Sequence, residues 1–187
     1  MIVIMLPQLN LLLDRLPGGE LEFAAGAAVF HRGDAIGLVH VVRAGVVHLV
    51  RHQDDGAALI LQRAHAGAVL AEASVYSQRY HCDARAETAS TTRAIPRSDL
   101  RRALVNDPKF AETWARHLAH EVQRARLQTE ILSLKTVAAR LSAWMVWNGD
   151  LPRRGLWTNI ANEISVSPEA LYREIARRRS AGRASQS

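Results

Sequence analysis

The positively charged residues near the end of the chain have the type and density that bind phosphate groups. Residues 135–187 contain nine Lys or Arg and four Asp or Glu, and they hold +5 of the formal net charge of +6. Residues 1–134 hold only the remaining +1. A compact basic end of this kind attracts a phosphate backbone. A basic surface that meets only solvent is the alternative that charge alone leaves open.

The sequence shows no clear set of metal-ligating or catalytic residues. The one cysteine, Cys82, can form neither an internal disulfide nor a cysteine-ligated iron–sulfur or zinc site. We expect it to be a small buried apolar side chain. The eight histidines contain no His-x-His pair, and no paired carboxylates or Ser-His-Asp set is evident. The sequence therefore favours neither a haem or other metal centre nor an enzyme.

The composition is that of a soluble globular protein, with 48% hydrophobic and 22% charged residues among 187. The apolar start of the chain is interrupted by Pro7, Gln8 and Asn10. It is a poor signal peptide and too short to span a bilayer. We therefore expect a cytoplasmic protein without a membrane segment.

A long helix is expected from Pro108 to about Trp147, because no glycine occurs there until Gly149. Apolar residues recur three and four apart along it, which is the spacing of a seam that two parallel helices bury against each other. The predicted dimer seam consists of Leu118, Val122, Ala125, Thr129 and Leu132. A long surface helix packed on its own domain is the alternative.

Short runs rich in Val, Leu and Ile occupy residues 21–96 and are separated by turn residues. Regular spacing with glycine at the breaks predicts an antiparallel barrel or roll. Asp54-Asp55-Gly56 is a candidate hairpin turn. The segment from Leu70 to Tyr76 breaks the rhythm, and we expect one short helical turn there.

Two short helices joined by a tight turn fit the basic end. The first is expected from Thr158 to Ile164, and the second opens at Ser167. Ser167 is a good N-cap, Pro168 suits the first helical position, and Glu169 favours a helix N-terminus. This arrangement is a helix-turn-helix unit.

The strand-rich part resembles the cyclic-nucleotide-binding roll of the Crp/Fnr transcription regulators. The resemblance rests on the sequence Phe30-His31-Arg32-Gly33-Asp34 and extends from about Phe23 to Arg179. The glycines at that family's turn positions are Gly26, Gly33, Gly45, Gly56 and Gly67. The resemblance implies an α+β protein with an N-terminal antiparallel β-roll (a double-stranded β-helix), a long dimerisation helix and a small C-terminal helix-turn-helix domain. We expect the boundaries 1–107, 108–134 (with a hinge at 133–135), 135–179 and a disordered basic tail at 180–187.

The effector pocket that the resemblance implies departs from the cAMP-binding pattern. That pattern has a Gly-Glu pair in the short helix, and Ala71-Glu72 stands there. It then has an Arg-Ser pair, whose arginine holds the cyclic phosphate, and Tyr80-His81 stands in its place. We therefore expect no tight binding of cAMP. The candidate lining residues are Glu72, Ala73, Ser74, Tyr80 and His81. They could contact another small molecule, or Tyr80 and His81 could fill the pocket.

The residues that the resemblance assigns to DNA contact are Ser167, Pro168, Glu169, Tyr172, Arg173 and Arg177. An arginine at the edge of the major groove can donate twice to guanine, and a glutamate can accept from cytosine. Two departures concern this part. Ser165 stands at a turn position where glycine is usual, and most of the family's β-hairpin wing is missing after the second helix.

The sequence thus predicts a homodimeric DNA-binding transcription regulator that reads a near-palindromic site. Double-stranded DNA is the expected partner, with RNA polymerase and an unknown small-molecule effector as candidates. Haem and an iron–sulfur cluster are not favoured as cofactors. The alternative is a dimeric ligand-sensing or protein-interaction module whose sequence-specific DNA binding is weak or lost.

Overall fold

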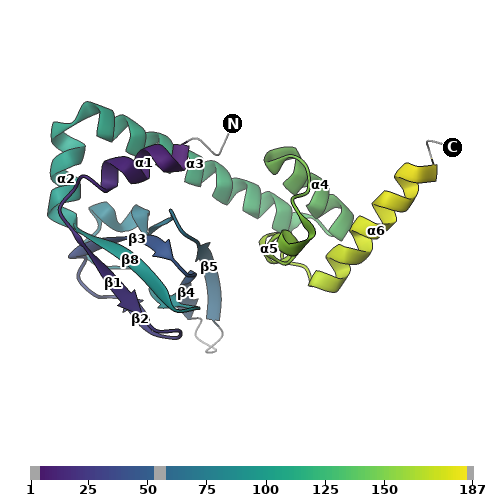
Figure 1. Ribbon diagram of the computed structural model, residues 1–187, viewed down its shortest axis with the longest axis horizontal. Helices are drawn as coiled ribbons and strands as arrows, with labels where there is room; N and C mark the ends of the chain where they lie inside the picture. Colours follow the sequence, from purple (N-terminus) through teal and green to yellow (C-terminus); the bar gives the residue numbers. More distant parts are fainter. Residues whose placement is uncertain (1–4, 53–57, 185–187) are drawn as a thin grey trace. The chain divides into compact units, whose positions relative to one another are not determined.

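The computed structural model describes residues 5–52 and 58–184, and it divides into two compact units (Figure 1). Unit 1 is Met1–Ala119 and unit 2 is His120–Ser187. The strands lie in unit 1, whereas unit 2 is helical. A long helix crosses the boundary between the units, so the chain passes from one to the other without leaving helical structure.

The elements follow one another in an order that separates strands from helices. Unit 1 contains α1 (Met5–Leu13), β1 (Gly19–Phe23), β2 (Ala28–Phe30), β3 (Leu38–Ala44), β4 (Val47–His52), β5 (Ala58–Ala64), β6 (Val69–Leu70), the 3₁₀ helix η1 (Glu72–Tyr76), β7 (Asp83–Ala86), β8 (Ser90–Pro96) and α2 (Arg97–Asn106). The long helix is α3 (Pro108–Ser133). Unit 2 continues with α4 (Val137–Asn148), the 3₁₀ turn η2 (Arg154–Leu156), α5 (Trp157–Glu163) and α6 (Pro168–Ala184).

The strands form two antiparallel four-stranded sheets, in the orders β1-β8-β3-β6 and β2-β7-β4-β5. Neighbours in space are often distant in sequence, as where β1 pairs with β8 from Gly19↔Ala94 to Phe23↔Ser90. The predicted α+β class and antiparallel roll are confirmed. The short helical turn expected from Leu70 to Tyr76 is η1. The hairpin turn expected at residues 54–56 lies outside the described residues.

The roll has apolar packing both inside and outside. Inside, Phe30, Val42, Tyr80 and Cys82 belong to one buried cluster. Outside, α1, α2 and the start of α3 cover one sheet with a second cluster, which includes Leu13, Val41, Leu100, Phe110 and Trp114. Strand β3 supplies residues to both clusters and is buried from Val39 to Val42, as expected for a strand with packing on both faces.

Glycine is needed at the turns of the roll. Gly26, Gly33, Gly45 and Gly67 all have positive φ, a conformation that glycine adopts without steric cost. At Gly45 a Cβ atom would also lie 2.3 Å from Ser90 Oγ and 2.4 Å from the carbonyl oxygen of Ala89. The glycine register read from the sequence therefore marks real turns, with Gly56 outside the described residues.

Unit 2 packs its helices around one apolar cluster. The buried members are Ile131, Leu141, Trp144, Trp157, Ile160, Ala161, Ile164, Leu171 and Ile175. Thr136 caps α4 by accepting a hydrogen bond from Ala139 N, 3.1 Å away. Ser167 caps α6 in the same way from Ala170 N at 3.2 Å. Both helices of the predicted turn unit begin within about one residue of the expected positions.

The helical structure of α6 continues to Ala184. We expected a disordered tail from residue 180, and this part of the expectation differs from the structure. The residues there other than Gly182 (Ser180, Ala181, Arg183 and Ala184) are compatible with a helix that has already been nucleated, and one glycine costs it only about 1 kcal/mol. Among the described residues, no helix is long and apolar enough to cross a membrane.

Candidate nucleic-acid interface and effector region

The turn between α5 and α6 holds a residue in left-handed backbone conformation. Ser165 has a φ of 52°, at the position where the sequence comparison expected glycine. Val166 N donates to the carbonyl of Ala161 at 2.9 Å, and Ser165 N donates to Asn162 O at 3.2 Å. These bonds hold the tight turn despite the cost of positive φ for a residue with a Cβ atom. The turn leads directly into the Ser167 cap of α6.

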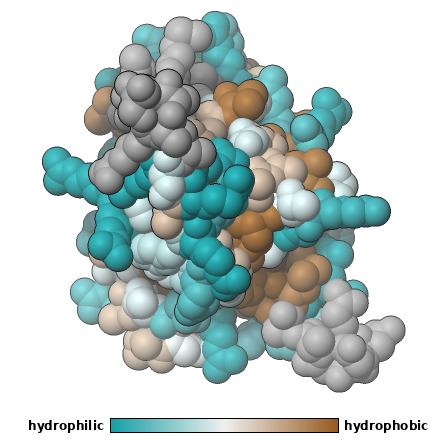
Figure 2. Space-filling view, turned by 90° about the vertical axis from the view of Figure 1, so that its right-hand side faces the viewer, coloured by the Kyte–Doolittle hydropathy of each residue, from teal (hydrophilic) through white to brown (hydrophobic). Residues whose placement is uncertain are grey.

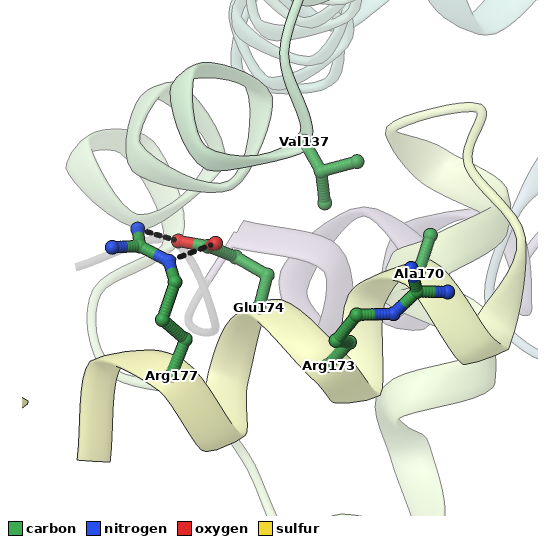
Figure 3. Close-up of a pocket in the computed structure, with 5 residues that line it drawn as sticks. All are labelled: Val137, Ala170, Arg173, Glu174 and Arg177. Carbon is green, nitrogen blue, oxygen red and sulfur yellow. Dashed lines mark hydrogen bonds and ion pairs between the residues drawn. The ribbon is translucent and has the colours of Figure 1, made fainter. Parts of the chain in front are cut away.

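The first turns of α6 present polar side chains to solvent. Glu169 and Arg173 are exposed and lie four residues apart, so they share one face of the helix. Arg173 also lines a hollow of about 210 Å³ together with Val137, Ala170, Glu174 and Arg177 (Figure 3). Pro168 is half-buried at the start of the helix. Arg173 is thus the basic side chain of the early helix that can reach a ligand outside it.

Glu174 binds two arginines of the same helix. Its carboxylate accepts from Arg177 Nε and Nη2 at 2.9 and 2.8 Å, and from Arg178 Nε at 2.8 Å. These bonds lower the pKa of Glu174 to about 2. Figure 3 shows the Arg177 pair beside the hollow, with Arg173 further along the helix. Arg177 was predicted to contact DNA. In the structure its side chain pairs with Glu174 and is still 65% exposed to solvent.

Arg178 holds α6 against α4. Its Nη2 donates to the carbonyl of Ala138 at 2.7 Å and to Ser142 Oγ at 2.8 Å. Its Nε is paired with Glu174 at the same time. Neither Arg178 nor Glu174 was singled out from the sequence. Their spacing of four residues on one helix is the sequence signal that could have identified this pair.

Tyr172 packs within unit 2 and is half-buried. Its ring centroid lies 5.3 Å from that of Trp157, and the guanidinium of Arg154 lies 5.7 Å from it. Arg179 lies over the Trp157 ring at 5.1 Å. A predicted DNA-contact residue, a core tryptophan and two basic side chains are thus linked by ring and cation–π contacts.

Tyr80 fills the interior of the roll. Its ring stacks on that of Phe30 with a centroid distance of 3.7 Å and an interplanar angle of 8°. Its hydroxyl donates to the carbonyl of Leu38 at 2.5 Å. The residue is 6% exposed, and burial raises its pKa to about 12. Of the two predicted roles for this position, this geometry supports the filling one.

The other predicted pocket residues lie on and near η1. Ser74 is buried and its Oγ lies 2.9 Å from His81 Nδ1, so these two residues meet. Ala73 and His81 are exposed, and Glu72 is half-buried. Ala71, which replaces the expected glycine, has a φ of 51°. The backbone therefore keeps the shape that glycine would give, while Tyr80 turns away into the core.

The predicted seam residues of α3 differ in their surroundings. Leu118 is half-buried and packs against the outer cluster of unit 1. Val122, Ala125, Thr129 and Leu132 are exposed, with Val122 at 49% and Leu132 at 45%. Val122 and Leu132 are therefore large apolar side chains on the exposed face of α3. The face of the molecule in Figure 2 is largely hydrophilic, with hydrophobic residues gathered to one side.

Within the described part of the chain, no group of three or more His, Cys, Asp or Glu residues is arranged to hold a metal ion. Cys82 is fully buried with a free thiol, as expected for a small apolar side chain.

Residues 20–107 match the cyclic nucleotide-binding domain family. The chain is also similar to solved structures over most of its length. These include FixK2 from Bradyrhizobium japonicum (19% identity, 89% of this chain and 87% of that one, TM-score 0.66). Another is CLP, a global regulator responsive to c-di-GMP from Xanthomonas campestris (16% identity, 95% and 92%, TM-score 0.59).

A third similar structure is a CRP-family transcriptional regulator from Thermus thermophilus, with 19% identity, coverage of 87% and 85%, and a TM-score of 0.55. No curated protein matches the chain.

Residues 20–107 thus match the cyclic nucleotide-binding domain family, and nearly the whole chain has the same fold as FixK2, CLP and the CRP-family regulator from Thermus thermophilus. This confirms the resemblance read from the glycine register.

Proposed function

We propose that this chain is a homodimeric transcription regulator that reads a near-palindromic DNA site through α6. The observation that carries the proposal is the separately packed helical unit, in which α6 is capped at Ser167 and exposes Glu169 and Arg173 from its first turns. Arginine can donate to both acceptors of guanine in the major groove, and glutamate can accept from cytosine. The excess positive charge of this end supplies attraction to phosphate.

Dimerisation through α3 would place two α6 helices on one duplex. The exposed stripe of Val122, Ala125, Thr129 and Leu132 has the alternating three and four residue spacing of a parallel two-helix seam. Two such units reading successive major grooves require half-sites about 34 Å apart. The proposed binding site is therefore an inverted repeat with half-sites about one helical turn apart.

The roll is proposed to respond to something other than cAMP. A cyclic phosphate needs a cation in the pocket, because a buried anion without one is poorly compensated. Tyr80 stands where the family's phosphate-binding arginine is expected, and its ring is stacked on Phe30. We expect calorimetric titration of the full chain with cAMP to show no tight binding.

The test of DNA reading is selection of bound duplexes from a pool with a randomised central segment, using the full chain at several salt concentrations. We expect enrichment of an inverted repeat and an affinity that falls as salt rises, because lysines and arginines displace counterions from phosphate. Equal affinity for all sequences would overturn sequence reading and favour the protein-interaction alternative.

The test of the dimer is sedimentation of Val122→Glu. Two glutamates would face each other across the seam, and like charges placed together cost several kcal/mol. The matched control is Gln123→Glu, which adds the same charge to an exposed neighbour outside the seam spacing. We expect dissociation only for Val122→Glu; a dimer that survives that change contradicts the seam.

A further inference from the structure

One arginine joins the end of α3 to the turn that precedes α6. Arg140, in the first turn of α4, donates from Nε to the carbonyl of Leu134 at 2.8 Å and from Nη2 to that of Leu132 at 3.2 Å. Its Nη1 donates to the carbonyls of Ile164 and Ser165 at 3.1 and 2.9 Å. A single guanidinium thus binds four main-chain oxygens from two segments about 30 residues apart in sequence.

The chemistry of these contacts makes them strong. Leu132 lies in the last turn of α3, and Ile164 is the residue that follows α5. Carbonyls at helix C-termini have no partner within the helix and carry partial negative charge. A guanidinium offers five donors in a planar fork and keeps its charge, so its hydrogen bonds to these oxygens are charge-assisted. Lysine, with three donors on one atom, cannot reproduce the fork.

Packing holds the same end of α3. Leu127 and Ile131 belong to the apolar cluster of unit 2, and Ile131 is 1% exposed. Gln128 donates from its side chain to the carbonyl of Glu163, at the end of α5. Residues 122–126, one turn earlier, are all exposed. The last two turns of α3 are therefore built into the helical unit.

We infer that Arg140 makes the break between α3 and α4 a fixed corner, so that α3 from Leu127 onward and α6 move as one body. Arg140 is then a positioning residue for DNA reading, because it fixes α6 relative to the seam helix that precedes it. The sequence suggested a hinge at residues 133–135. The helix is interrupted there, between Ser133 and Val137, but Arg140 binds the carbonyls of Leu132 and Leu134 at this interruption.

The first test is amide hydrogen exchange of the full chain as wild type, Arg140→Gln and Arg140→Lys. The amides of Leu134, Ser165 and Val166 are hydrogen-bonded and report on both sides of the corner. We expect protection in the wild type and exchange about tenfold to hundredfold faster on both sides together in Arg140→Gln, the factor expected from losing charged hydrogen bonds. Arg140→Lys should recover only part of the protection.

The matched control for exchange is Arg124→Gln, an exposed arginine of α3 outside the seam spacing. It should leave the three amides unchanged. Unprotected amides at 134 and 165 in the wild type, or an unchanged pattern in Arg140→Gln, would overturn the fixed corner. If Arg140→Gln fails to fold, amide protection in the wild type and its partial loss in Arg140→Lys still test the fixed corner.

The second test rests on the proposed function and uses the ratio of affinities for the selected and random duplexes. The measurement is made well below the melting temperature of the variant, so that the protein is folded. We expect Arg140→Gln to lower this ratio about tenfold or more and to retain binding to the random duplex. A residue that only stabilises the fold would lower the melting temperature and leave the ratio unchanged, which would overturn the positioning role. If the wild type shows no sequence preference, the proposed function fails while hydrogen exchange still tests the corner.

Discussion

The interior of the roll and the exposed face of α6 are the two regions where the resemblance to Crp/Fnr regulators implies contact with nucleotides, and their chemistry differs. In the roll, the position expected to carry a cation is Tyr80, stacked on Phe30 and closed to solvent. On α6, Arg173 is exposed beside an open hollow. One region uses an aromatic ring to complete a core, and the other keeps an exposed guanidinium.

This difference shows that the backbone fold of the roll does not depend on the side chains that would bind a ligand. The roll retains its glycine turns and even the left-handed residue before η1, although Ala71 has replaced glycine there. Backbone shape is fixed by many packed residues, whereas anion binding depends on one or two side chains. The fold of the roll can therefore be kept without the side chains that would bind a cyclic phosphate.

The largest expected effect tests whether the roll is full. Tyr80→Ala should lower the free energy of unfolding of unit 1 by roughly 3–5 kcal/mol, because it removes a buried aromatic ring and leaves a cavity. Urea unfolding followed by circular dichroism measures this. Tyr76→Ala, which alters a tyrosine that is 65% exposed, should change stability by less than about 1 kcal/mol. Equal costs would mean that Tyr80 occupies an open pocket.

The next effect tests the exposed cation of α6. Arg173→Ala should weaken binding to the selected duplex by ~1–3 kcal/mol per half-site, through loss of a base contact, with little change for random DNA. Fluorescence anisotropy with labelled duplexes measures both. The control is Arg79→Ala, which removes an exposed arginine of the roll and should leave the preference intact. A uniform loss over all sequences would assign Arg173 to phosphate instead.

Acid should distinguish the two units. Burial lowers the pKa of His40 to about 4 from its ordinary 6.5, so the unfolded chain binds a proton at higher pH than the folded one. Stability of the roll is then lost as pH falls from 6.5 toward 4, by about 2 kcal/mol between pH 7.5 and 5. In unit 2, the pKa of Glu174 is lowered to about 2 from 4.5, so its contribution is lost only as pH falls through that lower range.

Unfolding at pH 7.5 and pH 5 measures this difference, with hydrogen exchange to separate the units. His40→Asn should flatten the dependence of unit 1, and His65→Asn, at an exposed residue, should not. Equal acid sensitivity of both units would contradict the burial of a neutral His40.

The smallest expected effect compares the two non-glycine residues with positive φ, Ala71 in the roll and Ser165 in the helical turn. Ala71→Gly and Ser165→Gly should each stabilise by about 1 kcal/mol, since the left-handed conformation costs a residue with Cβ roughly that amount. Thermal unfolding measures the gain. Ala176→Gly, in the interior of α6, should instead cost about 1 kcal/mol. Loss of stability in either of the first two would mean that the side chain itself is needed.

The features that could be predicted from the sequence are those with a local cause. Gly33 and Gly67 mark turns because a backbone shape demands them, and Ser167 starts α6 because its hydroxyl caps the next amides. The sequence also placed Tyr80, whose ring is stacked on Phe30, where the resemblance implies an arginine.

The features that escaped prediction depend on long side chains that reach across the fold. The contacts of Arg140 join segments about 30 residues apart, and those of Arg178 join α6 to α4. An arginine can lie along many directions with similar energy, so its sequence neighbours do not tell which carbonyls it meets. The extension of α6 to Ala184 was missed because composition alone indicated a tail.

The reactivity of the single thiol can report on opening motions of the roll. Cys82 is fully buried, and burial raises its pKa, so a thiol reagent can react only when the roll opens. The rate of labelling of the unaltered protein therefore measures opening of that unit alone, without any engineered probe. A compound that binds the roll should slow the reaction in proportion to its occupancy, so the labelling rate of Cys82 can be used to screen compounds for binding to the roll.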